Sequence, residues 1–151
     1  MDMPAWMGNV PEIIMAAGTL LLFWQIFQGR QQARTTFEDS LDKEYRDIIH
    51  KLPSKAVLGG PLDDAKFEEH LDEFFAYFDL CNQQAFLRQR DRISDDTWAY
   101  WSDGMRANLK KRAFRTAWEH VKQHATGEFN ELRTLEASDF RADPAKAGHS
   151  L

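Results

Sequence analysis

Residues 10–27, VPEIIMAAGTLLLFWQIF, are the stretch that most constrains the fold of this chain, because a small soluble domain has no way to bury it on all sides. Eighteen residues of helix span about 27 Å at roughly 1.5 Å per residue, close to the bilayer hydrocarbon thickness of about 30 Å. The sequence therefore predicts one transmembrane helix near the N-terminus. A buried core helix is the alternative, favoured by the shortness of the stretch and by Glu12, Thr19 and Gln25.

The charges around this stretch predict its orientation. No Lys or Arg occurs in residues 1–29, whereas Arg30, Arg34, Lys43 and Arg46 follow the apolar run. The positive-inside rule then places the N-terminus outside and the rest of the chain in the cytosol, as in a single-pass protein of the inner (cytoplasmic) membrane. A cleaved signal peptide is a second alternative, but such peptides carry positive charge before the apolar run.

Polar residues inside the stretch predict helix association. Glu12 and Thr19 are seven residues apart and nearly aligned on the helix, while Gly18 and Gln25 align on a second line. Polar groups facing lipid are costly, so this polar face, Glu12, Thr19 and Gln25, is expected to turn toward protein or water in a homo-oligomer. Alternatively, Glu12 lies at the level of the lipid headgroups and needs no partner.

The charges of the remaining chain are unevenly distributed, although the net charge is only -5. Acidic residues dominate residues 36–85, and basic residues dominate residues 86–123, which predicts charge matching within or between subunits. The single cysteine, Cys81, excludes a disulfide framework and a cysteine zinc site, and agrees with a reducing compartment.

Apolar residues after the stretch follow helical spacing throughout, and no strand-like alternation occurs. The first stripe runs through Ala33, Phe37, Leu41, Tyr45, Ile48 and Leu52, so the N-terminal helix is expected to continue as a rod of up to about 40 residues ending before Pro53. A turn-like segment, residues 53–63, follows. The next helix begins at Asp63 or Asp64 and places Phe74 and Phe78 at the centre of a seven-residue repeat.

Three further helices are expected after that repeat. Ser94 marks the start of one with Trp98, Trp101 and Met105 on its stripe; the others carry Phe114 and Trp118, and then Leu132. The prediction is an all-α protein in which one N-terminal transmembrane helix joins a cytosolic helical bundle. The expected division is residues 1–29 for the anchor, 30–137 for the cytosolic domain and 138–151 for a flexible tail.

Arg115 and His120 are the candidate catalytic residues. Their spacing in RTAWEH resembles the Arg, four residues, His motif of HEPN ribonucleases, which are small helical bundles. The resemblance implies that Arg and His from two subunits meet across a dimer to cleave RNA, with His in proton transfer and Arg stabilising phosphate charge. Thr116 departs from the family pattern. The structural alternative is an ion pair of Arg115 with Glu119 one helical turn away.

Two other groups of residues suggest binding. His120 and His124 have the spacing of a metal-binding pair, but no third ligand follows at a telling distance, so neither a metal nor a cofactor is predicted. A basic patch, Arg106, Lys110, Lys111 and Arg112, is a candidate for contact with RNA phosphates or anionic headgroups. A solvated face that balances the acidic helices is the alternative.

The segments FFAYFDLCNQQAFLRQRDRISDDTWAYW and FRTAWEHV, together with the N-terminal span, resemble small bacterial membrane proteins linked with abortive phage infection. The membrane accessory proteins of RNA-targeting CRISPR systems are also similar in size and topology. These resemblances imply an oligomeric, non-enzymatic effector or accessory protein of antiphage defence that acts on membrane lipid or on a defence protein partner. The alternatives are a membrane-tethered HEPN-like ribonuclease and a scaffold subunit of a larger membrane complex.

Overall fold

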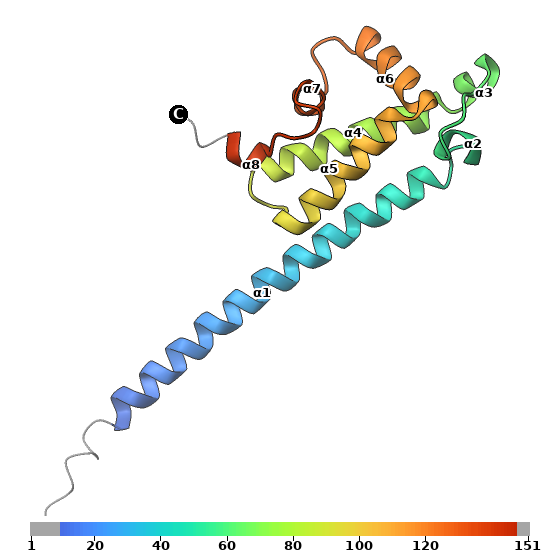
Figure 1. Cartoon of the computed structure of the whole chain (residues 1–151). Helices are drawn as coiled ribbons and strands as arrows, with labels where there is room; N and C mark the ends of the chain where they lie inside the picture. The colour runs from blue at the N-terminus through green and yellow to red at the C-terminus, as the bar shows by residue number, and fades with distance from the viewer. Residues whose placement is uncertain (1–9, 148–151) are drawn as a thin grey trace, which may run out of the picture. The chain divides into compact units, whose positions relative to one another are not determined.

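The computed structural model describes the backbone of residues 10–147 and the side chains of residues 20–146. Over this range the chain is helical and contains no strand, which confirms the all-α prediction. The helices are α1 (Val10–Ile49), α2 (Ser54–Val57), α3 (Asp64–Glu69), α4 (Leu71–Gln89), α5 (Asp95–Lys110), α6 (Arg112–His124), α7 (Asn130–Ala137) and α8 (Pro144–Ala147) (Figure 1).

The chain divides into two compact units, Met1–Phe37 and Glu38–Leu151. The sequence-based division lay at residue 29, close to the end of the apolar stretch. Helix α1 runs through the boundary, which agrees with the expected continuous rod of about 40 residues ending before Pro53. Residues 10–37 of α1 therefore belong to the first unit, and residues 38–49 belong to the second.

In the first unit, the described part of α1 exposes its apolar residues. The large side chains among residues 20–27 are each between 55% and 70% exposed. Across the described part of the chain, no helix is both long and apolar enough to cross a membrane. The side chains of Glu12 and Thr19 lie outside the described residues, and Gln25 is exposed.

The second unit has an aromatic core built around α4. Helices α6, α7 and α8 pack against α4, and α5 packs against α6 (Figure 1). Phe74 and Phe78 are fully buried, as the seven-residue repeat predicts. Phe74 meets Phe114 edge to face with ring centroids 5.2 Å apart, and Phe78 lies 5.0 Å from the ring of Trp118. Such offset and edge-on pairs fill the core while avoiding face-to-face repulsion.

The helix expected from residue 63 or 64 onward is interrupted in the structure. Asp63 accepts a hydrogen bond from the backbone N–H of Lys66 and caps α3, but the chain leaves helical geometry at His70 before α4 begins. Residues seven apart in an unbroken helix are separated by about 10 Å along the axis. The break instead brings the rings of Phe67 and Phe74 to 6.1 Å. The preceding turn-like segment also contains the short helix α2, which was not expected.

The later helices follow the sequence-based expectations. The Ser94 hydroxyl accepts a hydrogen bond from the backbone N–H of Thr97 and so caps α5. Trp98, Trp101 and Met105 are buried on the inner face of α5. Between α6 and α7 the chain turns at Gly127, whose φ of 89° favours glycine.

Candidate functional site

Arg115 and His120 both lie on α6, but they face different directions. Five residues along a helix rotate by about 140° around its axis. Arg115 is exposed, whereas the His120 ring lies 5.9 Å from the Phe67 ring, in an edge-on contact. Glu119 pairs with Lys122 at 2.8 Å, and the described residues show no ion pair of Glu119 with Arg115, the suggested alternative. One chain alone therefore does not bring Arg115 and His120 together.

His120 and His124 stack on each other, with ring centroids 4.2 Å apart and an interplanar angle of 25°. Nδ1 of His124 lies 2.8 Å from the backbone carbonyl oxygen of His120, so one ring nitrogen already has a local partner. Within the described residues, no group of three or more His, Cys, Asp or Glu side chains is placed to hold a metal ion. The histidine pair is thus an aromatic contact of the helix surface.

Two residues of the basic patch, Arg106 and Lys111, form hydrogen bonds within the chain. Arg106 donates a hydrogen bond to Asp139 at 2.7 Å, and Nζ of Lys111 donates to the side-chain oxygen of Asn108 at 2.7 Å. Partial burial lowers the pKa of Lys111. Lys110 and Arg112 are left on the surface. Two of the four residues are therefore engaged within the chain, and the other two are exposed.

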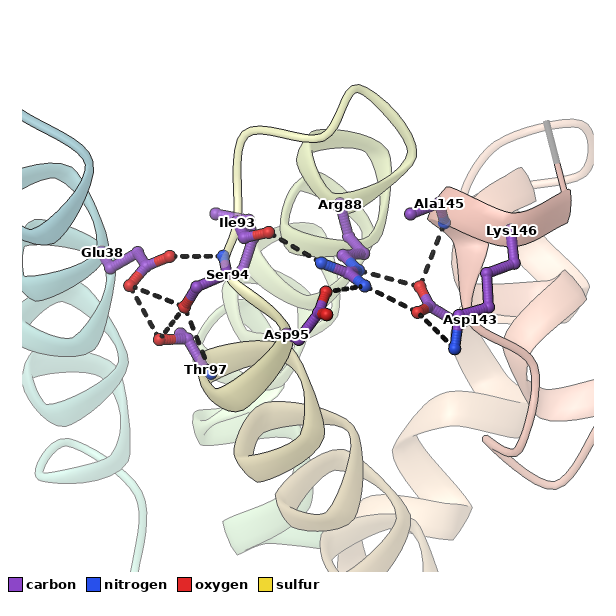
Figure 2. Close-up of polar contacts among 9 residues, drawn as sticks. All are labelled: Glu38, Arg88, Ile93, Ser94, Asp95, Thr97, Asp143, Ala145 and Lys146. Carbon is purple, nitrogen blue, oxygen red and sulfur yellow. Dashed lines mark hydrogen bonds and ion pairs between the residues drawn. The ribbon is translucent and has the colours of Figure 1, made fainter. Parts of the chain in front are cut away.

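A buried arginine, Arg88, is the centre of a polar network (Figure 2). Its Nε and Nη2 donate to the two carboxylate oxygens of Asp143 at 2.8 and 2.6 Å, and Nη2 also donates to Asp95 at 2.6 Å. Its Nη1 donates to the Ile93 carbonyl oxygen at 2.8 Å. The hydrogen bonds to Asp143 raise the pKa of Arg88, and they hold the pKa of Asp143 below its usual range.

This network joins segments far apart in the sequence. Arg88 ends α4, Asp95 begins α5, and Asp143 precedes α8 (Figure 2). The stretch 138–151 was expected to be a flexible tail; in its described part the bidentate pair with Arg88 holds Asp143, and the short helix α8 follows. Local periodicity carries no signal for such a pair. An aspartate directly before Pro144, after an aperiodic stretch, was the one available hint.

On the other side of α5, Glu38 closes the start of that helix (Figure 2). One carboxylate oxygen accepts from the backbone N–H of Ser94 at 2.6 Å, and the other accepts from the Thr97 hydroxyl at 2.7 Å. A carboxylate at a helix N-terminus satisfies free N–H groups and the positive end of the helix dipole. Glu38 and Arg88 thus both hold the first turn of α5 through hydrogen bonds.

A cavity of about 300 Å³ lies between the second unit's part of α1, α4 and α5. Its lining includes four aromatic residues, Tyr45, Tyr77, Tyr100 and Trp101. Trp101 donates its indole N–H to Asp42 at 2.7 Å, which orients the ring at the cavity wall. Sequence reasoning missed this site, because Tyr45 and Trp101 were interpreted as members of core stripes.

Polar groups at the cavity differ in their chemistry. Burial raises the pKa of the Cys81 thiol to about 12 and raises that of the Tyr77 hydroxyl, so both groups stay neutral at ordinary pH. Gln84 is only 4% exposed, lines the cavity, and makes no hydrogen bond through its amide to another described residue. The cavity therefore presents an amide to a ligand and lacks an activated nucleophile among its described lining residues.

Comparisons with protein families, with curated proteins and with solved structures find no match to this chain, so its function has to be inferred from its own residues.

Proposed function

We propose that this chain is a membrane-anchored module that acts without catalysis, through contacts of its second unit with a partner. The observation that carries the proposal is the exposure of the large apolar side chains among residues 20–27, each at least 55% accessible. Large apolar patches of this kind on a protein surface mark interaction with a membrane or with another protein.

The distribution of these side chains favours lipid over a protein partner. Leu20, Leu21, Leu22, Phe23 and Trp24 are consecutive, and successive residues of a helix point about 100° apart. Together they cover the full circumference of α1. A partner helix or a protein groove covers one stripe, whereas acyl chains cover every side at once.

The flanking charge supports an orientation for the anchor. Arg30, Arg34, Lys43 and Arg46 all follow the apolar run, so the proposal places the second unit on the cytosolic side of the inner membrane. Action through contacts is ranked first because it needs no catalytic pair, whereas ribonuclease activity would need Arg115 and His120 of two subunits to meet across a dimer. A role in antiphage defence, with self-association of the anchor, is what the resemblance of the sequence adds to the proposal.

The test is vesicle flotation of the full chain with a double variant, Leu21→Asp with Phe23→Asp. Each aspartate near the centre of an apolar helix opposes insertion by about 2.5 to 3.5 kcal/mol, so the double variant is expected to leave the vesicle fraction. Leu58→Asp is the matched control, because Leu58 is 85% exposed but lies outside the apolar run. We expect Leu58→Asp to float like the wild type.

The proposal fails if the wild-type chain stays at the bottom of the gradient, or if the double variant floats as well as the wild type. A parallel assay for cleavage of single-stranded RNA addresses the alternative. Cleavage by the wild type that is lost in His120→Ala, by about two to four orders of magnitude, would put the ribonuclease function first.

A further inference from the structure

The cavity between α1, α4 and α5 has the size and walls of a small-molecule site. Its volume of about 300 Å³ is at the lower end of the range for ligand pockets, roughly 300 to 1,000 Å³. All of its lining residues belong to the second unit, so the site is complete within that unit. A pocket of this size accepts a ring system better than an extended chain.

The aromatic walls indicate a flat ligand. Trp101 is held in place by its hydrogen bond to Asp42, and Tyr77 by a hydrogen bond from Asn108 at 3.1 Å. Rings whose polar ends are already fixed offer their faces and edges to a guest at little entropic cost. A planar aromatic ligand gains most from such walls.

Gln84 specifies what the edge of that ligand carries. The Gln84 side chain is only 4% exposed and makes no hydrogen bond to another described residue, and its amide atoms are not among the fully buried polar atoms without a partner, so the amide is left accessible where Gln84 lines the cavity. An amide side chain pairs through its carbonyl and its NH₂ with a ligand edge that carries a donor beside an acceptor, as glutamine does with adenine. Gln84 is therefore the residue that would recognise the donor and acceptor groups at the edge of the ligand.

The charged residues that line the cavity argue against a phosphate group as the part of the ligand that determines binding. The lining holds one cation, Arg46, against the two carboxylates Asp42 and Asp103. A phosphate site would need several converging donors or cations. The net negative lining disfavours an anionic ligand, and Asp42 is already occupied by the indole N–H of Trp101, so a neutral ligand fits this lining.

We propose that this cavity binds a neutral, planar heteroaromatic ring with adjacent hydrogen bond donor and acceptor groups at one edge, of the purine base class. Gln84 pairs with that edge, and the ring lies against the aromatic walls. This site is independent of the proposed membrane anchor, so failure of one does not decide the other.

Gly104 provides a way to close the cavity. It lines the cavity from α5, and a Cβ atom built on it meets nothing within 4 Å. Gly104→Leu would place a side chain into this space and also remove a helix-weakening glycine. Gly29 is the matched control, because a Cβ there also meets nothing within 4 Å but the residue lies outside the cavity.

The experiment measures binding of adenine, adenosine, adenosine monophosphate and indole to the full chain in detergent by saturation-transfer NMR and titration. We expect adenine and adenosine to bind, Gly104→Leu to weaken both at least tenfold, and Gly29→Leu to leave both unchanged. Gln84→Met keeps the length of the side chain but removes the amide. It should weaken adenine about ten- to a hundredfold and leave indole, which lacks the donor and acceptor pair, unchanged.

Thermal melts confirm that each variant is folded before its binding is measured. The proposal is overturned if neither adenine nor adenosine binds the wild type, or if Gly104→Leu binds them as tightly. It is also overturned if Gln84→Met weakens indole as much as adenine, which would mean an unselective apolar cavity. Tighter binding of the monophosphate than of adenosine would refute the neutral ligand.

Discussion

Phe78 illustrates at the scale of one residue how the core of the second unit is held. It is fully buried, its ring lies against Trp118, and it also meets Tyr77 at 5.3 Å. A side chain with neighbours on all sides cannot be removed without leaving a cavity, because the surrounding rings relax only in part.

We expect Phe78→Ala to lower the free energy of unfolding by about 3 to 5 kcal/mol. Phe75, three residues earlier on α4, is 43% exposed, so Phe75→Ala is the matched control and should cost distinctly less. Chemical denaturation of the full chain in detergent, followed by far-UV circular dichroism, measures both. Equal losses for the two variants would show that the interior is not organised around Phe78.

The sequence anticipated residues of this kind well. Phe74, Phe78, Trp101 and Trp118 were all expected on buried stripes, and all four are buried. Periodicity detects them because burial of a helix face is a local property of the sequence. Phe86 of α4 is 40% exposed, because the repeat marks the centre of a buried face and does not fix its width.

At the scale of elements, the prediction agreed with the structure where the sequence signal came from neighbouring residues. The end of α1 before Pro53 and the start of α5 after Ser94 followed from proline and from an N-cap residue. The attachment of α8 did not, because it depends on Arg88 and Asp143, which are 55 positions apart. The cavity was missed for the same reason: three separate helices form it.

The α8 attachment predicts a dependence of stability on pH. The hydrogen bonds from Arg88 hold the pKa of Asp143 below its usual value, which is about 3.9 in an unfolded chain. The unfolded state therefore binds more protons near that pH than the folded state. The stabilisation is fully present above about pH 4 and is lost as pH falls through the folded-state pKa.

The measurement compares melting temperatures of the wild type and Asp143→Asn at pH 7, 4 and 2.5. Asp143→Asn should be less stable at pH 7, and the gap should narrow toward pH 2.5 as the wild-type carboxylate is protonated. Asp79→Asn, an exposed position of α4, is the control and should have little effect at pH 7. A gap that stayed constant down to pH 2.5 would contradict the assigned role of the Arg88 pair.

At the scale of the whole molecule, the uneven charge found in the sequence has a specific internal outcome. Two bases of the middle segment pair with acids that lie within it or after it: Arg88 with Asp95 and Asp143, and Arg106 with Asp139. The acidic residues of the first half are not their partners in these pairs. Charge matching was expected. Which residues pair, however, follows from the path of the chain after α6 and not from the overall distribution of acids and bases along the sequence.

Because Cys81 is buried, the reaction rate of its thiol reports how often this part of the second unit becomes accessible. Only a thiolate reacts with iodoacetamide, and burial raises the pKa of the Cys81 thiol to about 12, so the folded protein holds very little thiolate at pH 8. Alkylation should then be slow in the wild type and faster in Phe78→Ala, as followed by mass spectrometry, and equal rates would show that the reagent reaches Cys81 through the cavity and not through opening of the core. The alkylation rate of this single thiol therefore measures how often Cys81 becomes accessible to the reagent. This rate can be measured in a membrane, in detergent or inside a living cell.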